Sequence, residues 1–319
     1  MTEGLQSWQQ RLWGTPVAIA IASLFFALVI QAFNPILIKL SESEVSPNAT
    51  VFNRFWISLV VVGLWNVLQI GRSRQSDRQA PTASLYSPKI LWLLLAMGIT
   101  GGTSMVLWAW SLTQTPVANS AIAFSLTPLF TTVLEWLIWR KRFELKFGIG
   151  MAIALFGTFT LGMQDLSYNT LYLQGDSIAL LGAVLFAVYL MLVEQLRTQL
   201  TATTIFLWRY AISIILVIPP LLVSSDLIFP SSWVGWLFVI LLAAGSAAQI
   251  LIVYSLKQLS SSLVALVLLL DPVLTAILAR IIFSEQLGWL NWLAFTVILL
   301  GVYLAISSKL MDRSTEFVA

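Results

Sequence analysis

LTPLFTTVL at residues 126–134 and LDPVLTAIL at residues 270–278 are two versions of one segment, and this segment decides the fold. The match extends in both directions, so that Trp92–Gly157 aligns with Trp236–Gly301 at a constant offset of 144 positions without a gap. Because membrane carriers are often built from two weakly similar halves, the repeat predicts a duplicated architecture rather than a coincidence between apolar segments. Among the identities, residue types rarer than Leu weigh most: Trp92/Trp236, Gly101/Gly245, Gln114/Gln258 and Pro128/Pro272.

The composition indicates a membrane protein. Of the 319 residues, 59% are hydrophobic and 10% are charged, whereas a soluble domain has about 25% charged residues. Apolar runs of about 20 residues recur along the chain without period-2 alternation, which predicts spanning helices and not a barrel. The net charge of +3 comes from short basic loops and does not indicate nucleic-acid binding. The chain has no Cys and no His, which excludes disulfides, thiol nucleophiles, Cys or His metal sites and a His proton relay.

The sequence therefore predicts an all-α integral membrane protein of ten transmembrane helices, arranged as two five-helix repeats. Basic loops stay in the cytoplasm, so the alternation of basic and acidic loops places both termini there. We expect the membrane to be the plasma membrane. Because five is odd, the second repeat is inserted with inverted topology. We expect a cytoplasmic N-terminus over 1–15, the first repeat over 16–163, the second over 164–308 and a cytoplasmic C-terminus over 309–319. The expected spans are 16–39, 49–70, 90–113, 117–139, 147–163, 176–196, 204–224, 233–254, 261–283 and 289–307.

Two prolines lie within the fourth and ninth expected spans. Pro128 and Pro272 cannot donate a backbone hydrogen bond, and each frees the carbonyl four residues back, on Phe124 and Leu268. One interpretation is a kink that only improves packing. The other is a broken helix whose carbonyls face a substrate cavity, and the matching placement in both halves favours it.

Asp271 stands directly before Pro272, about halfway along its span, and aligns with the uncharged Thr127. A carboxylate at the centre of a bilayer costs about 2.5–3.5 kcal/mol and usually faces a cavity or a partner. We expect Asp271 to bind the cationic group of a substrate or a coupling proton. The alternative is a structural hydrogen bond between helices.

Other polar and aromatic residues within the spans are candidates for a cavity lining. Each is by itself as well explained by helix–helix hydrogen bonding, but together they predict one modestly polar cavity near the midplane. Arg54 and Arg209, near the starts of the second and seventh spans, are expected to extend to the lipid headgroups. The expected cavity residues are Asn34, Trp108, Ser125, Tyr189, Gln249 and Asp271.

With these residues in place, the chain resembles the drug/metabolite transporter superfamily, in particular its EamA-type branch. That family has a basic residue early in the second helix of each half, a later helix with a central proline, a Glu-containing turn and a Gly-bearing last helix. The resemblance covers about 16–308, and in the first half Lys141 stands where the turn should carry Glu. The matching residues are Arg54 and Arg209, Leu126-Thr127-Pro128 and Leu270-Asp271-Pro272, Glu285-Gln286-Leu287, and Gly157 and Gly301.

The resemblance implies a secondary transporter that exports a small organic metabolite, such as an amino acid, by alternating access between the halves. Its expected partners are the small-molecule substrate, the lipid bilayer and a coupling proton, with no nucleic acid, no cofactor and no metal. An intramembrane enzyme is the first alternative, but no cluster of carboxylates is spaced for acid–base or metal chemistry. A channel or a sensor is the second, although a pore usually repeats its charged ring and Asp271 has no charged mate.

Overall fold

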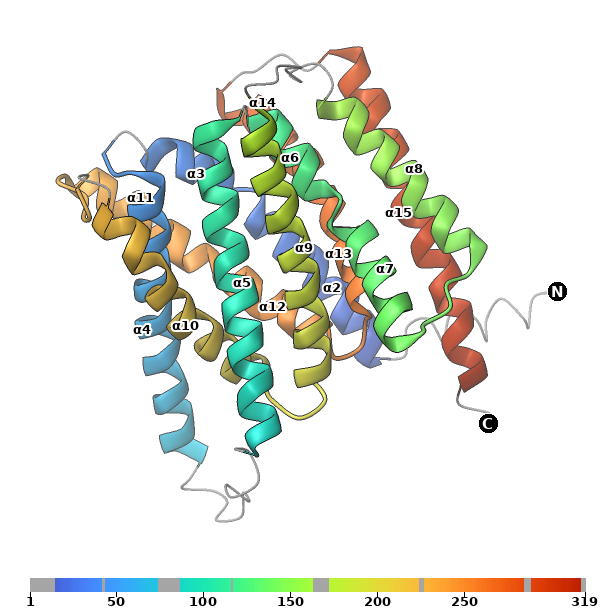
Figure 1. Ribbon diagram of the computed structural model, residues 1–319, viewed down its shortest axis with the longest axis horizontal. Coiled ribbons are helices and arrows are strands. Elements are labelled where there is room, and N and C mark those ends of the chain that lie inside the picture. The colour runs from blue at the N-terminus through green and yellow to red at the C-terminus, as the bar shows by residue number, and fades with distance from the viewer. Residues whose placement is uncertain are drawn as a thin grey trace.

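The computed structural model describes residues 15–41, 44–73, 87–115, 117–162, 172–223, 227–283 and 288–316. Within these ranges the chain is helical and forms no strand (Figure 1). The helices are α2 Thr15–Gln31, α3 Asn34–Ser41, α4 Pro47–Ser73, α5 Pro88–Gln114, α6 Val117–Ser125, α7 Thr127–Trp139, α8 Leu145–Gly162, α9 Leu173–Leu196, α10 Ala202–Val223, α11 Trp233–Gly245, α12 Ala247–Ser255, α13 Ser261–Val267, the short 3-10 helix η2 Leu268–Leu270, α14 Asp271–Phe283 and α15 Trp289–Glu316.

The helices have the length and composition of membrane spans. In the described part of the chain, nine segments are long and apolar enough to cross a bilayer, counting broken helices as one, and the shorter apolar helix Leu145–Thr160 coincides with the fifth expected span. The prediction of an all-α integral membrane protein is confirmed.

Several spans are broken near their centres. The fourth breaks between α6 and α7, and the ninth breaks through η2, with Pro128 and Pro272 each the second residue of the following helix. Proline is well suited to the first turn of a helix, where its missing N–H would have no partner. The first span breaks between α2 and α3, and the eighth between α11 and α12. These interruptions lie within the spans, at a depth where the backbone of a membrane protein must find its hydrogen-bond partners inside the protein.

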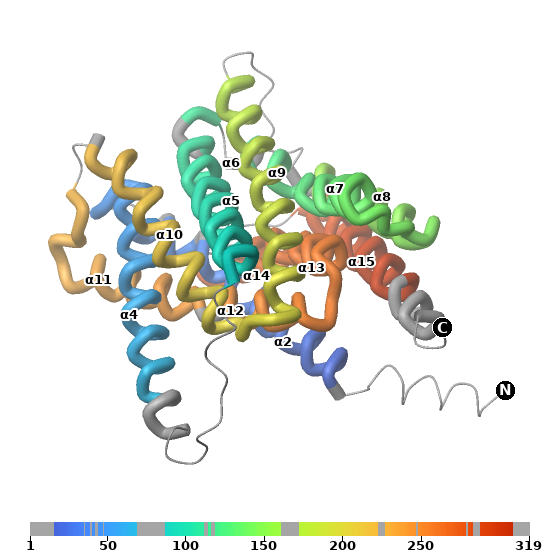
Figure 2. Tube along the Cα trace, turned by 60° about the horizontal axis from the view of Figure 1, so that its bottom comes forward, coloured from blue at the N-terminus to red at the C-terminus, as the bar shows by residue number. Residues whose placement is uncertain are grey.

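Equivalent helices of the two halves pack against one another. Helix α4 packs on α10, and α8 packs on α15, so the second and the fifth helices of the repeats form symmetric pairs. Figures 1 and 2 show the α8–α15 pair on one side of the molecule and the α4–α10 pair on the other. Helix α5 lies between α9 and α10, and the corresponding α11–α12 unit lies against α2, α3 and α4.

We name the two ends of the bundle by their charge. At the basic end, α7, α9 and α12 terminate and α13 begins, and the neighbouring residues include Arg140, Lys141, Arg197 and Lys257. At the opposite end, α3, α5 and α14 terminate and α6, α9 and α11 begin, and the acidic residues Glu44 and Asp176 lie there.

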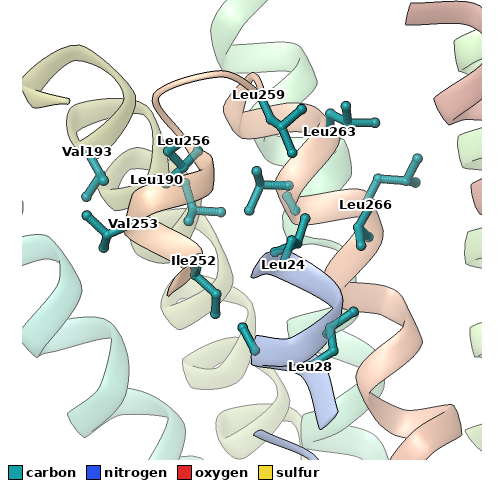
Figure 3. Close-up of a cluster of buried hydrophobic side chains, with 14 of the residues drawn as sticks. Leu24, Leu28, Leu190, Val193, Ile252, Val253, Leu256, Leu259, Leu263 and Leu266 are labelled. Atoms are coloured by element: carbon teal, nitrogen blue, oxygen red, sulfur yellow. The ribbon is translucent and has the colours of Figure 1, made fainter. Parts of the chain in front are cut away.

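The largest apolar core lies toward the basic end. Figure 3 shows leucine, isoleucine and valine side chains of α2, α9, α12 and α13, and of the α12–α13 connection, converging on one another. Every residue of α13 is buried. Because lipid tails are as apolar as leucine, such a core stabilises a membrane protein by close packing rather than by removal from water. The labelled residues are Leu24, Leu28, Leu190, Val193, Ile252, Val253, Leu256, Leu259, Leu263 and Leu266.

Candidate functional site

A group of polar side chains meets in the interior around Arg209 of α10. One Arg209 terminal nitrogen donates to the Tyr189 hydroxyl at 2.9 Å and to Gln249 Oε1 at 2.8 Å. The amide of Gln249 in turn donates to Gln31 Oε1 at 2.9 Å. The guanidinium also lies over the Tyr189 ring, 4.2 Å from its centroid. Helices α2, α9, α10 and α12 are thus joined through one buried cation.

Arg54 is the counterpart of Arg209 in the first half. Its Nε donates to Ser246 Oγ at 3.1 Å, at the break between α11 and α12. Packing of α4 on α10 places Phe55 against Tyr210, with ring centroids 4.9 Å apart, and this contact brings the two arginines toward each other. We call Gln31, Asn34, Arg54, Tyr189, Arg209, Ser246 and Gln249 the central polar cluster.

The expectation that these arginines extend to the headgroups is wrong. Both side chains are 5% exposed and make their hydrogen bonds inside the protein. Position within the span misled the prediction, because a residue two turns from a helix end can point inward as readily as outward. The pairing of the second helices across the pseudo-symmetry axis decides the direction.

A second constant spacing between the two halves of the sequence predicts that Arg54 and Arg209 lie close together. Arg54 and Arg209 are 155 positions apart, and so are Asn34 and Tyr189. Asn34 lies against Gly245, where an added Cβ would be 2.9 Å from its Oδ1, and Tyr189 lies against Gly101, where an added Cβ would be 2.7 Å from its ring. Since Gly101 and Gly245 are themselves aligned by the offset of 144, the contacts are equivalent in the two halves. The first two spans of each repeat therefore follow one offset and the last three another.

The structure connects four of the predicted cavity residues. Tyr189 and Gln249 bind Arg209 directly, and Asn34 begins α3 directly beyond the break in the first span. Trp108 is linked to Tyr189 by a chain of ring contacts through Phe124 and Phe186, with centroid distances of 6.3, 5.4 and 5.5 Å. Ser125 instead donates to Ile122 O of its own helix at 2.7 Å.

Asp271 begins α14 beside this cluster. Its Oδ1 is buried and has no hydrogen-bond partner among the described residues. One turn further on, Thr275 donates to Ala32 O at 3.3 Å, in the break between α2 and α3. The start of α14 therefore lies against the segment that carries Gln31 and Asn34.

The backbone carbonyls expected to be free at the two breaks already have partners. Phe124 O accepts a hydrogen bond from the Thr127 hydroxyl at 2.6 Å, and Leu268 O accepts one from the backbone N–H of Asp271. The polar surface at each break is consequently a side chain rather than a bare carbonyl.

A second polar cluster, which the sequence reasoning did not identify, closes the basic end. Glu135 of α7 is fully buried and accepts hydrogen bonds from the hydroxyls of Ser261 and Ser262 at the start of α13. Glu194 of α9 accepts from the Ser261 backbone and hydroxyl, both at 2.7 Å. Lys141 lies between the carboxylates, 2.9 Å from Glu194 and 3.4 Å from Glu135. We call these five residues the carboxylate clamp. The Ser260-Ser261-Ser262 run was its sequence signal, since such residues commonly begin helices.

The two ends of the bundle differ in how the broken helices meet. At the basic end α13 packs along α7. The equivalent helices at the opposite end are α6 and α14, but α6 packs on α8 and α9 while α14 packs on α2 and α3. In the described residues no comparable contact joins α6 to α14. The central polar cluster is thus sealed more tightly from the basic end.

The remaining carboxylates at the opposite end have local roles. Asp176 accepts from the Thr115 hydroxyl at 2.6 Å and from Asn119 at 3.4 Å. Glu44 accepts from the side chain and the backbone N–H of Ser232, and these hydrogen bonds hold the pKa of its carboxyl below the ordinary value. The described part of the chain holds no group of three or more His, Cys, Asp or Glu suited to a metal. The predicted Glu285-Gln286-Leu287 turn lies outside the described residues.

Apolar helices in two related halves, broken around a buried polar centre, define a multi-pass membrane transporter of the inverted-repeat class. The chain belongs to the EamA-like transporter family, which matches residues 18–163 and 173–307.

Two curated relatives have transporter names. An "Uncharacterized transporter" of Archaeoglobus fulgidus is 22% identical over 296 residues, covering 90% of this chain and 96% of the relative. "Solute carrier family 35 member G1" of Mus musculus is 25% identical over 213 residues, covering 61% of this chain and 56% of the relative. A solved crystal structure superposes with a TM-score of 0.73 at 18% identity, over 92% of this chain and 98% of that chain, which supports the fold.

Proposed function

We propose that this protein is a secondary transporter that exports a small organic metabolite, such as an amino acid, by alternating access between its two repeats. The observation that carries the proposal is the unequal closure of the bundle around the central polar cluster. The α7–α13 contact and the carboxylate clamp close the basic end, whereas among the described residues the equivalent helices α6 and α14 make no comparable contact. Exchange of these two arrangements would expose the cluster to each side in turn.

The proposed setting is the plasma membrane, with the basic end and both termini in the cytoplasm. The distribution of basic loops supports this orientation, because positively charged loops resist translocation. Reporters fused at Met1 and Ala319 should both report the cytoplasm, and a reporter inserted beside Glu44 should report the other side. Termini found on opposite sides would contradict the inverted repeat itself.

Asp271 is proposed to bind the coupling proton or the cationic group of the substrate. Its buried, unpartnered Oδ1 at the start of α14 supports this role, since an unpaired polar group inside a membrane protein usually marks a binding position. Energy would then come from an ion gradient. The outward direction is what the resemblance to EamA-type exporters implies.

The decisive experiment is a metabolite screen in oriented vesicles. Inside-out vesicles containing the protein should accumulate the substrate when a proton gradient is imposed, and right-side-out vesicles loaded with it should release it. Vesicles with an Asp271→Asn variant serve as the matched control. A screen in which no solute moves faster than in protein-free vesicles would refute the proposal.

A further inference from the structure

Two buried cations, Arg54 and Arg209, come together in the interior, and among the described residues neither forms an ion pair. Arg54 and Arg209 are each 5% exposed, and they lie close enough for their charges to repel. The ion pairs among the described residues join Lys141 to Glu135 and Glu194 at the basic end, and neither arginine takes part in one. Burying a charge without a counter-ion is strongly unfavourable even after the surrounding structure relaxes.

The neutral partners of the arginines offset only part of this cost. Arg54 has the hydroxyls of Ser246 and Tyr210, and Arg209 has Tyr189 and Gln249. A desolvated cation–π contact such as that of Arg209 with Tyr189 is favourable but leaves the positive charge in place. A purely structural bridge between helices could use neutral amides, which would avoid the repulsion altogether. The pair is better explained if an anion joins it.

Unpartnered atoms show where such an anion would bind. Among the described residues, Arg209 Nε is buried and has no hydrogen-bond partner, and the hydroxyl of Ser213, one turn further along α10, has none either. Gly101 of α5 packs beside this nitrogen: a Cβ added there would lie 3.1 Å from it and 2.7 Å from the Tyr189 ring, so a larger residue would crowd the donor. A guanidinium presents parallel N–H groups that match the two oxygens of a carboxylate.

Unpartnered acceptors lie on other helices. Asn34 Oδ1 of α3 and Asp271 Oδ1 of α14 are both buried and without a partner among the described residues. These oxygens suit a cationic group, whereas the arginines suit an anionic one. A solute that carries both groups a short distance apart would satisfy both sets of atoms.

Resting on the transport function proposed above, we propose that Arg54 and Arg209 bind the carboxylate of a zwitterionic amino acid substrate, and that Asn34 and Asp271 bind its ammonium group. Arg54 and Arg209 then share one negative charge supplied by the solute. The site is composed of one basic residue from each repeat, so the carboxylate lies at the pseudo-symmetry axis. The cationic group of the solute distinguishes the two halves, because only the second repeat supplies a carboxylate at the helix break.

The test compares matched solutes in proteoliposomes of the purified full chain. The probes are a radiolabelled mixture of the twenty amino acids, the same compounds as methyl esters, and the corresponding decarboxylated amines. We expect uptake of the acids to exceed that of the esters and amines by about 10-fold or more, the difference expected for a lost charge-assisted pair. Arg54→Gln and Arg209→Gln should each reduce uptake of the acids by a similar factor, whereas Arg142→Gln, at an exposed arginine, should leave it unchanged.

Folding and binding are measured separately from transport. Each variant is accepted only if it elutes as a single species, and Arg209→Lys, which keeps the charge but loses the parallel donors, provides a milder variant. The amino acid mixture should raise the unfolding temperature of the wild-type protein but not that of the Arg209→Gln variant. Esters or amines transported as well as the acids would overturn the carboxylate assignment while leaving the transporter intact. Inorganic phosphate competing more strongly than acetate would overturn it in favour of a phosphoryl anion. If the metabolite screen finds a substrate but no amino acid moves, the inference is wrong and the proposed transport function stands.

Discussion

The two broken helices began as copies of one segment, and the structure uses them differently. In the first, α6 and α7 are separated by one residue, and the Thr127 hydroxyl caps the Phe124 carbonyl at 2.6 Å. In the second, a 3-10 turn separates α13 from α14, and Asp271 begins α14 with an unpartnered oxygen. The Thr127 hydroxyl at the first break is thus satisfied within its own segment, whereas Asp271 Oδ1 at the second break has no partner among the described residues.

The same comparison holds for the first halves of these helices. Helix α13 is buried at every residue and its first two serines are held by Glu135 and Glu194. Its mate α6 begins with apolar residues at the positions of those serines, and its Ala121 is exposed. Tight closure therefore belongs to one end of the molecule, and it depends on residues that the duplication did not copy.

The largest expected effect comes from removing the charge at the second break. Asp271→Asn keeps the size and hydrogen-bonding capacity of the side chain, so membrane insertion should be near normal while transport, or its pH dependence, is abolished. The measurement is uptake into proteoliposomes across a range of pH. An Asn variant that transports normally with an unchanged pH profile would assign Asp271 a structural hydrogen bond instead.

The next effect concerns the closure of the basic end. Glu135→Gln removes the charge that accepts from Ser261 and Ser262, and each hydrogen bond to a charged group contributes about 1.5–3 kcal/mol. Loss of about 2 kcal/mol would shift the balance between closed and open basic ends by roughly 30-fold.

A single cysteine makes this opening measurable. The chain has no Cys, so Ser125→Cys alone can report access to the interior at the first break. A membrane-impermeant thiol reagent should label it from the opposite end in the parent protein, and from the basic end only when Glu135→Gln is added. Labelling from the basic end without the second change would contradict the closed arrangement.

A smaller effect is expected at the first break. Thr127→Val removes the hydroxyl that caps Phe124 O but keeps the volume, which should lower the free energy of unfolding by about 1 kcal/mol. Because this break is proposed to be structural, transport should be retained, in contrast to the Asp271 variant. Thermal unfolding in detergent and uptake by the same preparation decide the point. Equal losses of transport at Thr127 and Asp271 would mean that the breaks are functionally equivalent.

The smallest effect is a pH dependence at the opposite end. Hydrogen bonds from Ser232 hold the pKa of Glu44 below its ordinary value of 4.5. The stability that this carboxylate contributes is therefore present above about pH 4.5 and is lost as the pH falls through the lowered pKa. Glu44→Gln should flatten the dependence of the unfolding temperature between roughly pH 3 and 6. Glu144→Gln, at an exposed carboxylate, is the control and should preserve that dependence.

The fold could be predicted from the sequence because the features that specify it lie within single helices and occur in both halves. The length of the apolar runs, the loop charges and the paired Pro128 and Pro272 each specify one helix at a time, and the offset of 144 then relates the last three spans of the two halves. The interior was harder to predict, because it depends on which face of each helix turns inward. Arg54 and Arg209 were assigned to the headgroups for this reason, although the offset of 155 that links them was present in the sequence.

The carboxylate clamp could not be predicted from the sequence of any one helix. Glu135, Glu194 and Ser261 come from three spans that are far apart in the chain, and no spacing rule connects them. Their mates in the other repeat have different chemistry, so the internal repeat gave no signal either. The Ser260-Ser261-Ser262 run indicates a helix start, but the carboxylates that bind it become visible only when the contacts between helices are known.

The close contact of α8 with α15 limits how far the two halves can drift apart. An added Cβ at Gly150 would lie 2.6 Å from Gly301 O and from Ala305 N, and one at Gly301 would lie 2.7 Å from Gly150 O. Each glycine is pressed against the backbone of the other helix, so no change of side chain on the partner can make room. Replacement of either glycine by a larger residue must therefore displace the partner helix, so the two fifth helices constrain each other's sequence. The clamp residues and Asp271, in contrast, can change in one repeat without a matching change in the other. In a duplicated protein of this architecture, the helix breaks and the contacts that close each end can diverge between the repeats, whereas the α8–α15 contact has to be kept.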